Sequence, residues 1–182
     1  MDAGDEPVEI AATRRWLERA VIGLNLCPFA KAVHVKRQIR FVLSDARDTE
    51  TLGDELEREL LHLQETPADY TDTTLIVHPH VLQDFADYND FLDVADRTLR
   101  RLGLEGDIQV ASFHPDYVFA GEPADDASNC TNRTPYPTLH LLREASIDRA
   151  VAAYPDPDVI VERNIATMRR LGADAFRRLL EP

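Results

Sequence analysis

The sequence predicts an α/β fold with a small three-stranded, mostly parallel sheet, flanking helices and a helical C-terminal third. Two observations lead to this class. Three short apolar segments alternate with two longer segments of helical periodicity, an order typical of parallel strands joined by right-handed crossovers. Beyond a long polar stretch that starts at residue 113, the remaining third of the chain carries helical patterns.

The three predicted strands are short and rich in apolar residues. The segment from Thr73 to Val77, with the sequence TTLIV, is almost continuously apolar and β-branched. This composition is typical of a strand that is buried on both faces of its sheet. The expected strands cover residues 39–43, 73–77 and 108–113.

The helices are predicted from apolar residues that recur at three- and four-residue spacing. Gly23 or Asn25 can adopt the left-handed conformation that ends the first helix. Because proline is favoured in a first helical turn, Pro135 and Pro137 predict the start of a helix after the polar stretch. The expected helices cover residues 8–23, 50–63, 82–102, about 134–154 with a break near Ser146, 156–171 and 173–180.

Length and composition predict one domain over residues 1–182, with a frayed start at residues 1–7. Hydrophobic residues make up 44% of the chain, which is enough for a packed core. The formal net charge is −13, so the surface repels phosphate backbones and anionic lipids. We therefore expect neither a nucleic-acid partner nor a membrane partner.

Cysteine content and the absence of targeting features indicate the compartment. Cys27 and Cys130 are the only cysteines, too few for the disulfide framework of a small secreted protein. No segment has the length of a membrane span, and the acidic N-terminus is unlike a secretory signal. These features predict a cytoplasmic protein with reduced thiols. They identify no cofactor and leave the oligomeric state open.

The stretch from Phe113 to Glu144 is the predicted centre of function. It is long, polar and irregular, yet it contains aromatic residues that a solvated linker would lack. His114 directly follows the third strand, at the carboxyl end where open parallel sheets bind ligands. His78 follows the second strand in the same way, and we interpret it, together with His80, as a solvated turn residue.

Polar residues around the helix start at Thr134 indicate an anion site. Asn132 and Arg133 lie just before it, where free backbone N–H groups and the helix dipole favour an anion. Arg133 and Arg143 can together clamp a carboxylate or a phosphate. In the alternative interpretation, Arg143 forms an internal salt bridge with the pair Asp125–Asp126. The predicted substrate-binding residues are Asn132, Arg133, Tyr136, His140 and Arg143.

Cys27 lies just past the end of the first predicted helix, before Pro28 and among apolar residues. A cysteine in this position is either a buried filler of the core or a thiol presented into a cleft. The filler is the commoner case. The sequence pattern leaves both interpretations open.

Four motifs resemble a bacterial family of proteins of unknown function, domain family 1415. They are NLCPFA at residues 25–30, DFADYNDFL at 84–92, ASFHPDY at 111–117 and TNRTPYPTLHLLRE at 131–144. The resemblance covers nearly the whole chain beyond the acidic N-terminus, with Thr134 where the family pattern leads us to expect serine. It implies a small single-domain protein and implies no particular activity.

The leading hypothesis is a cysteine-dependent hydrolase or transferase that acts on a small anionic carboxylate or phosphate. Cys27 is the nucleophile and His114 is its base, and Asp116 or Glu144 orients that base. The two arginines of the polar stretch hold the anion, which makes a small anionic molecule the expected partner.

Two alternatives come from other classes of function. In the first, His114, His140 and Glu144 bind Zn or Fe through two histidines and a carboxylate, His140 and Glu144 being four residues apart on a helix. Participation of Cys27 or Cys130 would favour zinc. In the second, the chain is a non-enzymatic binder of small anions or an interaction module.

Overall fold

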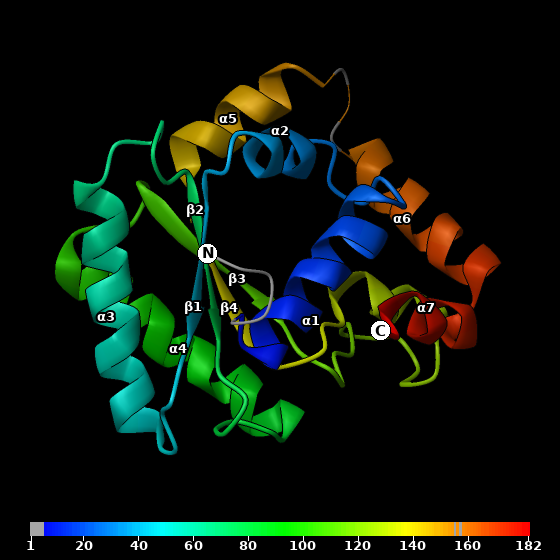
Figure 1. Ribbon diagram of the computed structural model, residues 1–182, viewed down its shortest axis with the longest axis horizontal. Helices are drawn as coiled ribbons and strands as arrows, with labels where there is room; N and C mark the ends of the chain where they lie inside the picture. The colour runs from blue at the N-terminus through cyan, green and yellow to red at the C-terminus, as the bar shows by residue number, and fades with distance from the viewer. Residues whose placement is uncertain (1–5, 155, 157) are drawn as a thin grey trace.

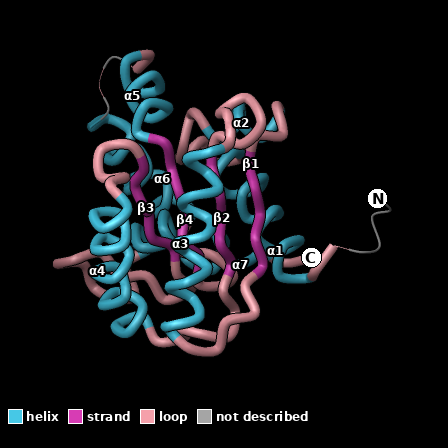
Figure 2. Tube along the Cα trace, turned by 90° about the vertical axis from the view of Figure 1, so that its left-hand side faces the viewer, coloured by secondary structure: helices cyan, strands magenta, loops and turns pink. Residues whose placement is uncertain are grey.

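The computed structural model describes residues 6–154, 156 and 158–182. Within them, four strands form one mixed sheet in the order β1-β2-β4-β3. The strands are β1 (Ile39–Leu43), β2 (Thr73–Val77), β3 (Ile108–Phe113) and β4 (Thr138–Arg143). Figure 2 shows them side by side in this order, from β1 on the right to β3 on the left. A frayed start was expected over residues 1–7. Residues 1–5 of this segment are outside the described residues.

The three predicted strands are confirmed with their bounds, but the predicted make-up of the sheet is wrong. β1 and β2 pair in parallel, whereas β4 pairs antiparallel with both β2 and β3. The sheet therefore has four strands in place of three, and most of its pairs are antiparallel. β2 and β3 still run in the same direction, because β4 is antiparallel to each of them.

β4 occupies the place of the helix expected from residue 134. Leu139 and Leu141 are fully buried against the helices of one face of the sheet, while His140 and Leu142 face the other side. This period of two is that of a strand. Residues that precede proline avoid the helical region, so Pro137 favours an extended chain here.

Helices cover both faces of this sheet, as Figure 1 shows. The elements are α1 (Val8–Trp16), the π-helical η1 (Leu17–Ile22), α2 (Ala30–Val35), α3 (Thr49–Glu65), α4 (Phe85–Leu102), the 3₁₀-helical η2 (Ala127–Asn132), α5 (Glu144–Ala152), α6 (Asp158–Leu171) and α7 (Ala173–Leu180). α3 and α4 lie on one face, and α1, α6 and α7 lie on the other. None of the helices in the described part of the chain is long and apolar enough to cross a bilayer.

Several predicted helices are confirmed, whereas the break predicted near Ser146 is not. The helix expected over residues 8–23 is the pair α1 and η1, and Asn25 takes the positive φ of 53° that was expected at Gly23 or Asn25. α6 ends before Gly172, and α7 has the predicted bounds. The break expected near Ser146 is absent from α5, and Pro157, at the expected start of α6, is outside the described residues.

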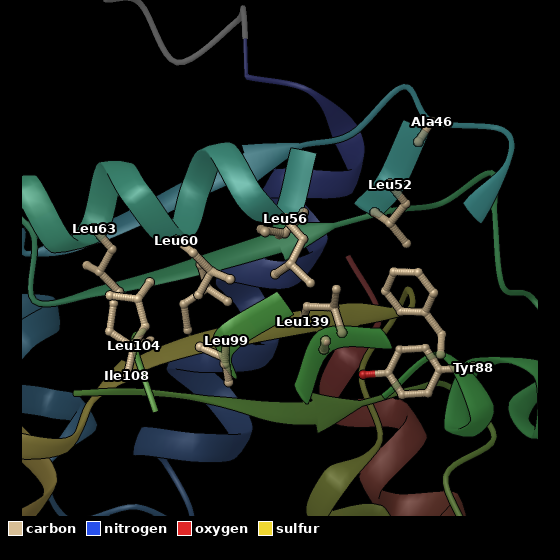
Figure 3. Packing of buried hydrophobic residues seen from close by; sticks show 14 of the residues in the cluster. Ala46, Leu52, Leu56, Leu60, Leu63, Tyr88, Leu99, Leu104, Ile108 and Leu139 are labelled. Atoms are coloured by element: carbon tan, nitrogen blue, oxygen red, sulfur yellow. The ribbon is translucent and has the colours of Figure 1, made fainter. Parts of the chain in front are cut away.

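We call the side covered by α3 and α4 the α3/α4 face. The apolar stripe of α3 is fully buried there, through Leu52, Leu56, Leu60 and Leu63. Figure 3 shows these leucines pointing toward labelled side chains of α4 and the sheet, among them Leu99, Leu139 and Tyr88. Each buried leucine contributes about 2 kcal/mol to stability. This face is a continuous apolar core.

We call the opposite side of the sheet the pocket face. Trp16, Met168 and Phe176 pack in its core, and Trp16 contacts the Phe113 ring edge-on with centroids 5.2 Å apart. The wide turns of η1 continue past its end, where the Leu26 N–H donates to the carbonyl of Val21, five residues earlier. These turns direct the following segment, which contains Cys27, along the edge of the pocket described below.

Candidate functional site

A pocket with a volume of about 390 Å³ lies between the pocket face of the sheet and the helices that cover it. Its floor is formed by strand residues that share this face: Ile39, Thr73, Leu75, Gln109, Ala111, Phe113, His140 and Leu142. Residues of α1, η1, α2, α5 and α6 form its walls. Most lining residues are apolar, and no lysine or arginine is among them. A concave, largely apolar cavity with a few polar groups is the usual form of a small-molecule site.

His140 is the titratable side chain at the centre of the floor, opposite Leu75 of β2 and Ala111 of β3. Its Nε2 lies 2.6 Å from the hydroxyl of Thr73, which itself donates to the Leu141 carbonyl at 2.6 Å. Because a hydroxyl has one proton, Nε2 of His140 donates to it, and Nδ1 is left as an acceptor. Burial lowers the pKa of His140 to about 4, so the ring is neutral at physiological pH.

Cys27 is exposed and lines the same pocket. The interpretation as a buried filler is therefore wrong. α6 holds the segment that carries the thiol: Asn164 donates from Nδ2 to the Leu26 carbonyl at 2.8 Å, and Arg163 donates from Nη2 to the Asn25 carbonyl at 2.8 Å. These two bonds hold the main chain on the N-terminal side of Cys27, while the residue itself is exposed.

His114 is fully buried and does not line the pocket. Its Nδ1 accepts from the backbone N–H of Asp116 at 3.0 Å, and its Nε2 lies 3.1 Å from the Leu82 carbonyl, to which it donates. The main chain of Asp116, and not its exposed carboxylate, orients the ring. Burial lowers the pKa of His114. Both ring nitrogens are engaged, so the expected pairing of His114 with Cys27 is not formed.

His78 is also fully buried, so its interpretation as a solvated turn residue is wrong, whereas His80 is exposed. The His78 ring stacks on Tyr88 with centroids 5.8 Å apart, and the His114 ring lies 5.0 Å from the same tyrosine. The Nδ1 of His78 donates to the Val81 carbonyl at 3.0 Å. The two histidines that end β2 and β3 therefore meet at one end of the sheet, although β4 separates the strands.

The residues predicted to hold an anion lie in different places. Asn132 lines the pocket. Arg133 does not: its Nε donates to the Tyr117 carbonyl at 3.0 Å and its Nη2 to the Ala124 carbonyl at 2.8 Å. Tyr136 is also outside the lining, and its carbonyl accepts from two threonine hydroxyls. Arg133 therefore ties the loop before η2 together.

Arg143 projects to the α3/α4 face, where it binds main chain. Its Nη2 donates to the carbonyls of Leu63 at 2.6 Å, Thr66, and Thr71 at 2.9 Å, and its Nε donates to that of Thr71. The C-terminal carbonyls of a helix lack intrahelical partners, and Arg143 supplies one at the end of α3. Burial lowers the pKa of Arg143.

The salt bridge that we considered for Arg143 is formed by a different arginine. Arg169 of α6 contacts Asp126 through Nε and Nη2, each at 3.1 Å, and reaches Glu122 at 3.2 Å. The Arg169 guanidinium holds the pKa of Asp126 below its usual range. This exposed network joins α6 to the loop before η2.

The geometry does not support the predicted metal ligands. His140 belongs to β4 and Glu144 begins α5, so the two do not share a helical turn as the hypothesis requires. Among the described residues, no group of three or more His, Cys, Asp or Glu side chains could hold a metal ion. The set His114, His140 and Glu144 therefore does not converge.

The predicted site residues do not include three that line the pocket: Trp16, Thr73 and Asn164. Trp16 ends α1, one residue before the wider turns of η1. Thr73 differs from Thr74 only in the face of β2 on which it lies. The Thr73 hydroxyl meets the His140 ring only if residues 138–143 are recognised as a strand beside β2, and that recognition was the available signal.

A sequence model of the family described as "Protein of unknown function (DUF1415)" matches residues 8–178. The chain belongs to this family. The family expected from the sequence is thereby confirmed. In this DUF1415 chain the match includes every residue that lines the pocket, from Trp16 to Asn164. No curated protein and no solved structure matches the chain.

Proposed function

We propose that the chain is a hydrolase or transferase in which Cys27 attacks a small molecule bound in the pocket and His140 takes up the thiol proton. One observation carries this proposal: an exposed thiol and a neutral imidazole with an available Nδ1 line the same cavity. The nucleophile is the one expected from the sequence. The base is His140 in place of His114.

The chemical steps are those of an acyl transfer. The Sγ of Cys27 forms a bond to the acyl carbon while Nδ1 of His140 accepts the thiol proton. The bond from that carbon to the leaving group then breaks, and the leaving group takes the proton from His140. Water or another acceptor attacks the resulting thioester, and the thiol regains a proton. A base with a pKa of about 4 holds its proton only briefly, so the His140 ring is neutral before the reaction begins.

A second candidate is a protein that binds the same kind of molecule without a covalent step. It is favoured by the absence of lysine and arginine among the pocket residues, since cationic neighbours are what usually stabilise a thiolate. The two candidates share the pocket and differ in the role of Cys27.

An activated ester tests the covalent step. We expect p-nitrophenyl hexanoate to release nitrophenol in an initial burst and to leave a hexanoyl thioester on Cys27, located by mass spectrometry of proteolytic fragments. Cys27→Ser should remove both signals. Cys130→Ser is the matched control and should keep them, because Cys130 is 2% exposed and burial raises the pKa of its thiol.

His140→Phe tests the base. Phenylalanine keeps an aromatic ring beside Phe113, whose centroid is 5.9 Å from that of His140, but has no nitrogen. We expect acylation of Cys27 to slow by roughly a hundredfold or more. An unchanged acylation rate would remove His140 from the mechanism. The absence of any adduct on Cys27 in the native protein would leave the non-covalent binder.

A further inference from the structure

Several residues of the pocket carry buried polar atoms that have no hydrogen-bond partner within the described part of the chain. They are Nε1 of Trp16, Oγ1 of Thr131 and Oδ1 of Asn164. Trp16 is 2% exposed and Asn164 is 8% exposed. A buried polar group left unpaired costs about 1–3 kcal/mol, so native structures rarely keep several of them in one place without a use.

Each of these atoms restricts the kind of group that can satisfy it. The indole N–H of Trp16 only donates, so it needs an acceptor. The Oδ1 of Asn164 only accepts, and since Nδ2 of the same amide already donates to Leu26, the side chain cannot turn over without losing that bond. The hydroxyl of Thr131 serves either partner. A ligand that pairs with all three must offer both an acceptor and a donor.

The charges around the pocket restrict the ligand further. The lining contains no lysine or arginine, and its carboxylate, that of Asp72, accepts from the Ser146 hydroxyl at 2.6 Å. His140 is neutral at physiological pH. An anion in this cavity would lose its hydration without gaining a counter-ion, and such desolvation is costly. Arg133 and Arg143 donate to main-chain carbonyls outside the lining.

We infer that the ligand of this pocket is an uncharged, largely apolar molecule with an amide-like group that presents an acceptor to Trp16 and a donor to Asn164. The inference rests on the proposed function, which makes this cavity the substrate site. It replaces the small anion expected from the sequence with a neutral amide or lactam on an apolar body.

Trp16 is the only tryptophan of the chain, so its fluorescence reports directly on the pocket. The test compares hexanamide with hexanoate, which have the same carbon chain and differ in charge. We expect hexanamide to change the Trp16 emission in a saturable way. Hexanoate should bind at least roughly tenfold more weakly, because its carboxylate lacks a donor and a counter-ion.

Thr131→Val locates the subsite, because valine has the shape of threonine and the hydroxyl it removes has no hydrogen-bond partner among residues 6–154, 156 and 158–182. We expect it to weaken hexanamide binding roughly five- to tenfold. Thr74→Val is the matched control. Its hydroxyl is equally buried and unpaired, but Thr74 does not line the pocket, so the affinity should not change. Trp16→Phe is a second variant that keeps a ring beside Phe113. Because it removes the tryptophan fluorescence, its affinity for hexanamide is measured by calorimetry.

Three results would overturn the inference: hexanoate binding as tightly as hexanamide, neither compound binding, or Thr131→Val and Thr74→Val weakening hexanamide equally. The covalent test on Cys27 is independent of all three. An acyl adduct on Cys27 without a preference for the amide would keep the proposed function and reject the neutral-amide subsite. A preference for the amide without an adduct would do the reverse.

Discussion

The two faces of the sheet are made from the same strands but are packed in different ways. On the α3/α4 face, the leucines of α3 fill the space above the sheet and are fully buried. On the pocket face, a cavity of about 390 Å³ remains above the strands. β4 shows the contrast between neighbours: Leu141 is fully buried on the first face, whereas Leu142 is half-buried and lines the cavity on the second.

This difference in packing indicates that the two faces of the sheet have different roles. A filled apolar core stabilises the fold, while a cavity with unpaired polar atoms costs stability and is kept where a ligand binds. The α3/α4 face also contains buried atoms without a hydrogen-bond partner in the described parts of the chain, Oγ1 of Thr74 and Nε2 of His78, but neither residue lines the pocket. We therefore expect the α3/α4 face to carry most of the stability, and the pocket face to carry the activity.

Adjacent leucines of β4 give the largest expected effect. Leu141→Ala should lower the free energy of unfolding by about 3 kcal/mol, because it opens a new cavity in a filled core. Leu142→Ala should lower it by only about 1 kcal/mol, because the side chain already borders an open cavity. Urea denaturation with both variants measures the difference. Equal losses would mean that the two faces are packed alike in solution.

The sequence predicts the strands that follow simple patterns. The continuous apolar run of β2 identifies a strand buried on both faces, and the structure confirms it. The leucine stripe of α3 and the Gly103 that ends α4 are equally local signals, and both elements are present. Such elements are predictable because neighbouring residues in the sequence determine them.

β4 was not predictable in the same way, because its pairing is between residues far apart in the sequence. Thr138 to Arg143 is buried on one face by α3 and α4 and borders the pocket on the other, which weakens the period of two. Its leucines are also good helix formers. The error affected the predicted site, since a helix over residues 134–154 would place His140 and Arg143, three residues apart, on one face, whereas in β4 they lie on opposite faces of the sheet.

The second largest expected effect is a pH dependence of the free energy of unfolding, and it comes from the buried histidines. Burial lowers the folded pKa of His78 from 6.5 to about 4, so the unfolded chain binds a proton first as the pH falls. The stabilising contribution of the neutral ring is complete above pH 6.5 and is lost progressively toward pH 4. At about pH 5 the loss should be about 2 kcal/mol. Denaturation curves at several pH values measure it.

His78→Phe should flatten this pH dependence, because the new ring can still stack on Tyr88 but does not titrate. His140→Phe should flatten it by a similar amount from the pocket face, where burial also lowers the pKa to about 4. Because the two residues lie on opposite faces, their effects should add. A pH profile that is unchanged in His78→Phe would show that this histidine is not buried in its neutral form.

The smallest expected effect on the free energy of unfolding comes from replacing Arg143. This replacement tests whether the arginine has a structural role or binds a ligand. Lysine keeps the charge but loses the planar fork, so Arg143→Lys cannot donate to all the carbonyls at the end of α3 in the same geometry. We expect a loss of about 1 kcal/mol in the free energy of unfolding. Arg169→Lys, in an exposed pair with Asp126, is the control and should cost only about 0.5 kcal/mol or less. Since Arg143 lies outside the pocket, hexanamide binding and acylation of Cys27 should be the same in Arg143→Lys as in the wild type.

Thermal melting of the wild type and of Arg143→Lys, each with and without sulfate, tests whether Arg143 binds an anion. An anion-dependent stabilisation that is present in the wild type and missing in Arg143→Lys would return this arginine to the anion site expected from the sequence, and would move the function toward the α3/α4 face.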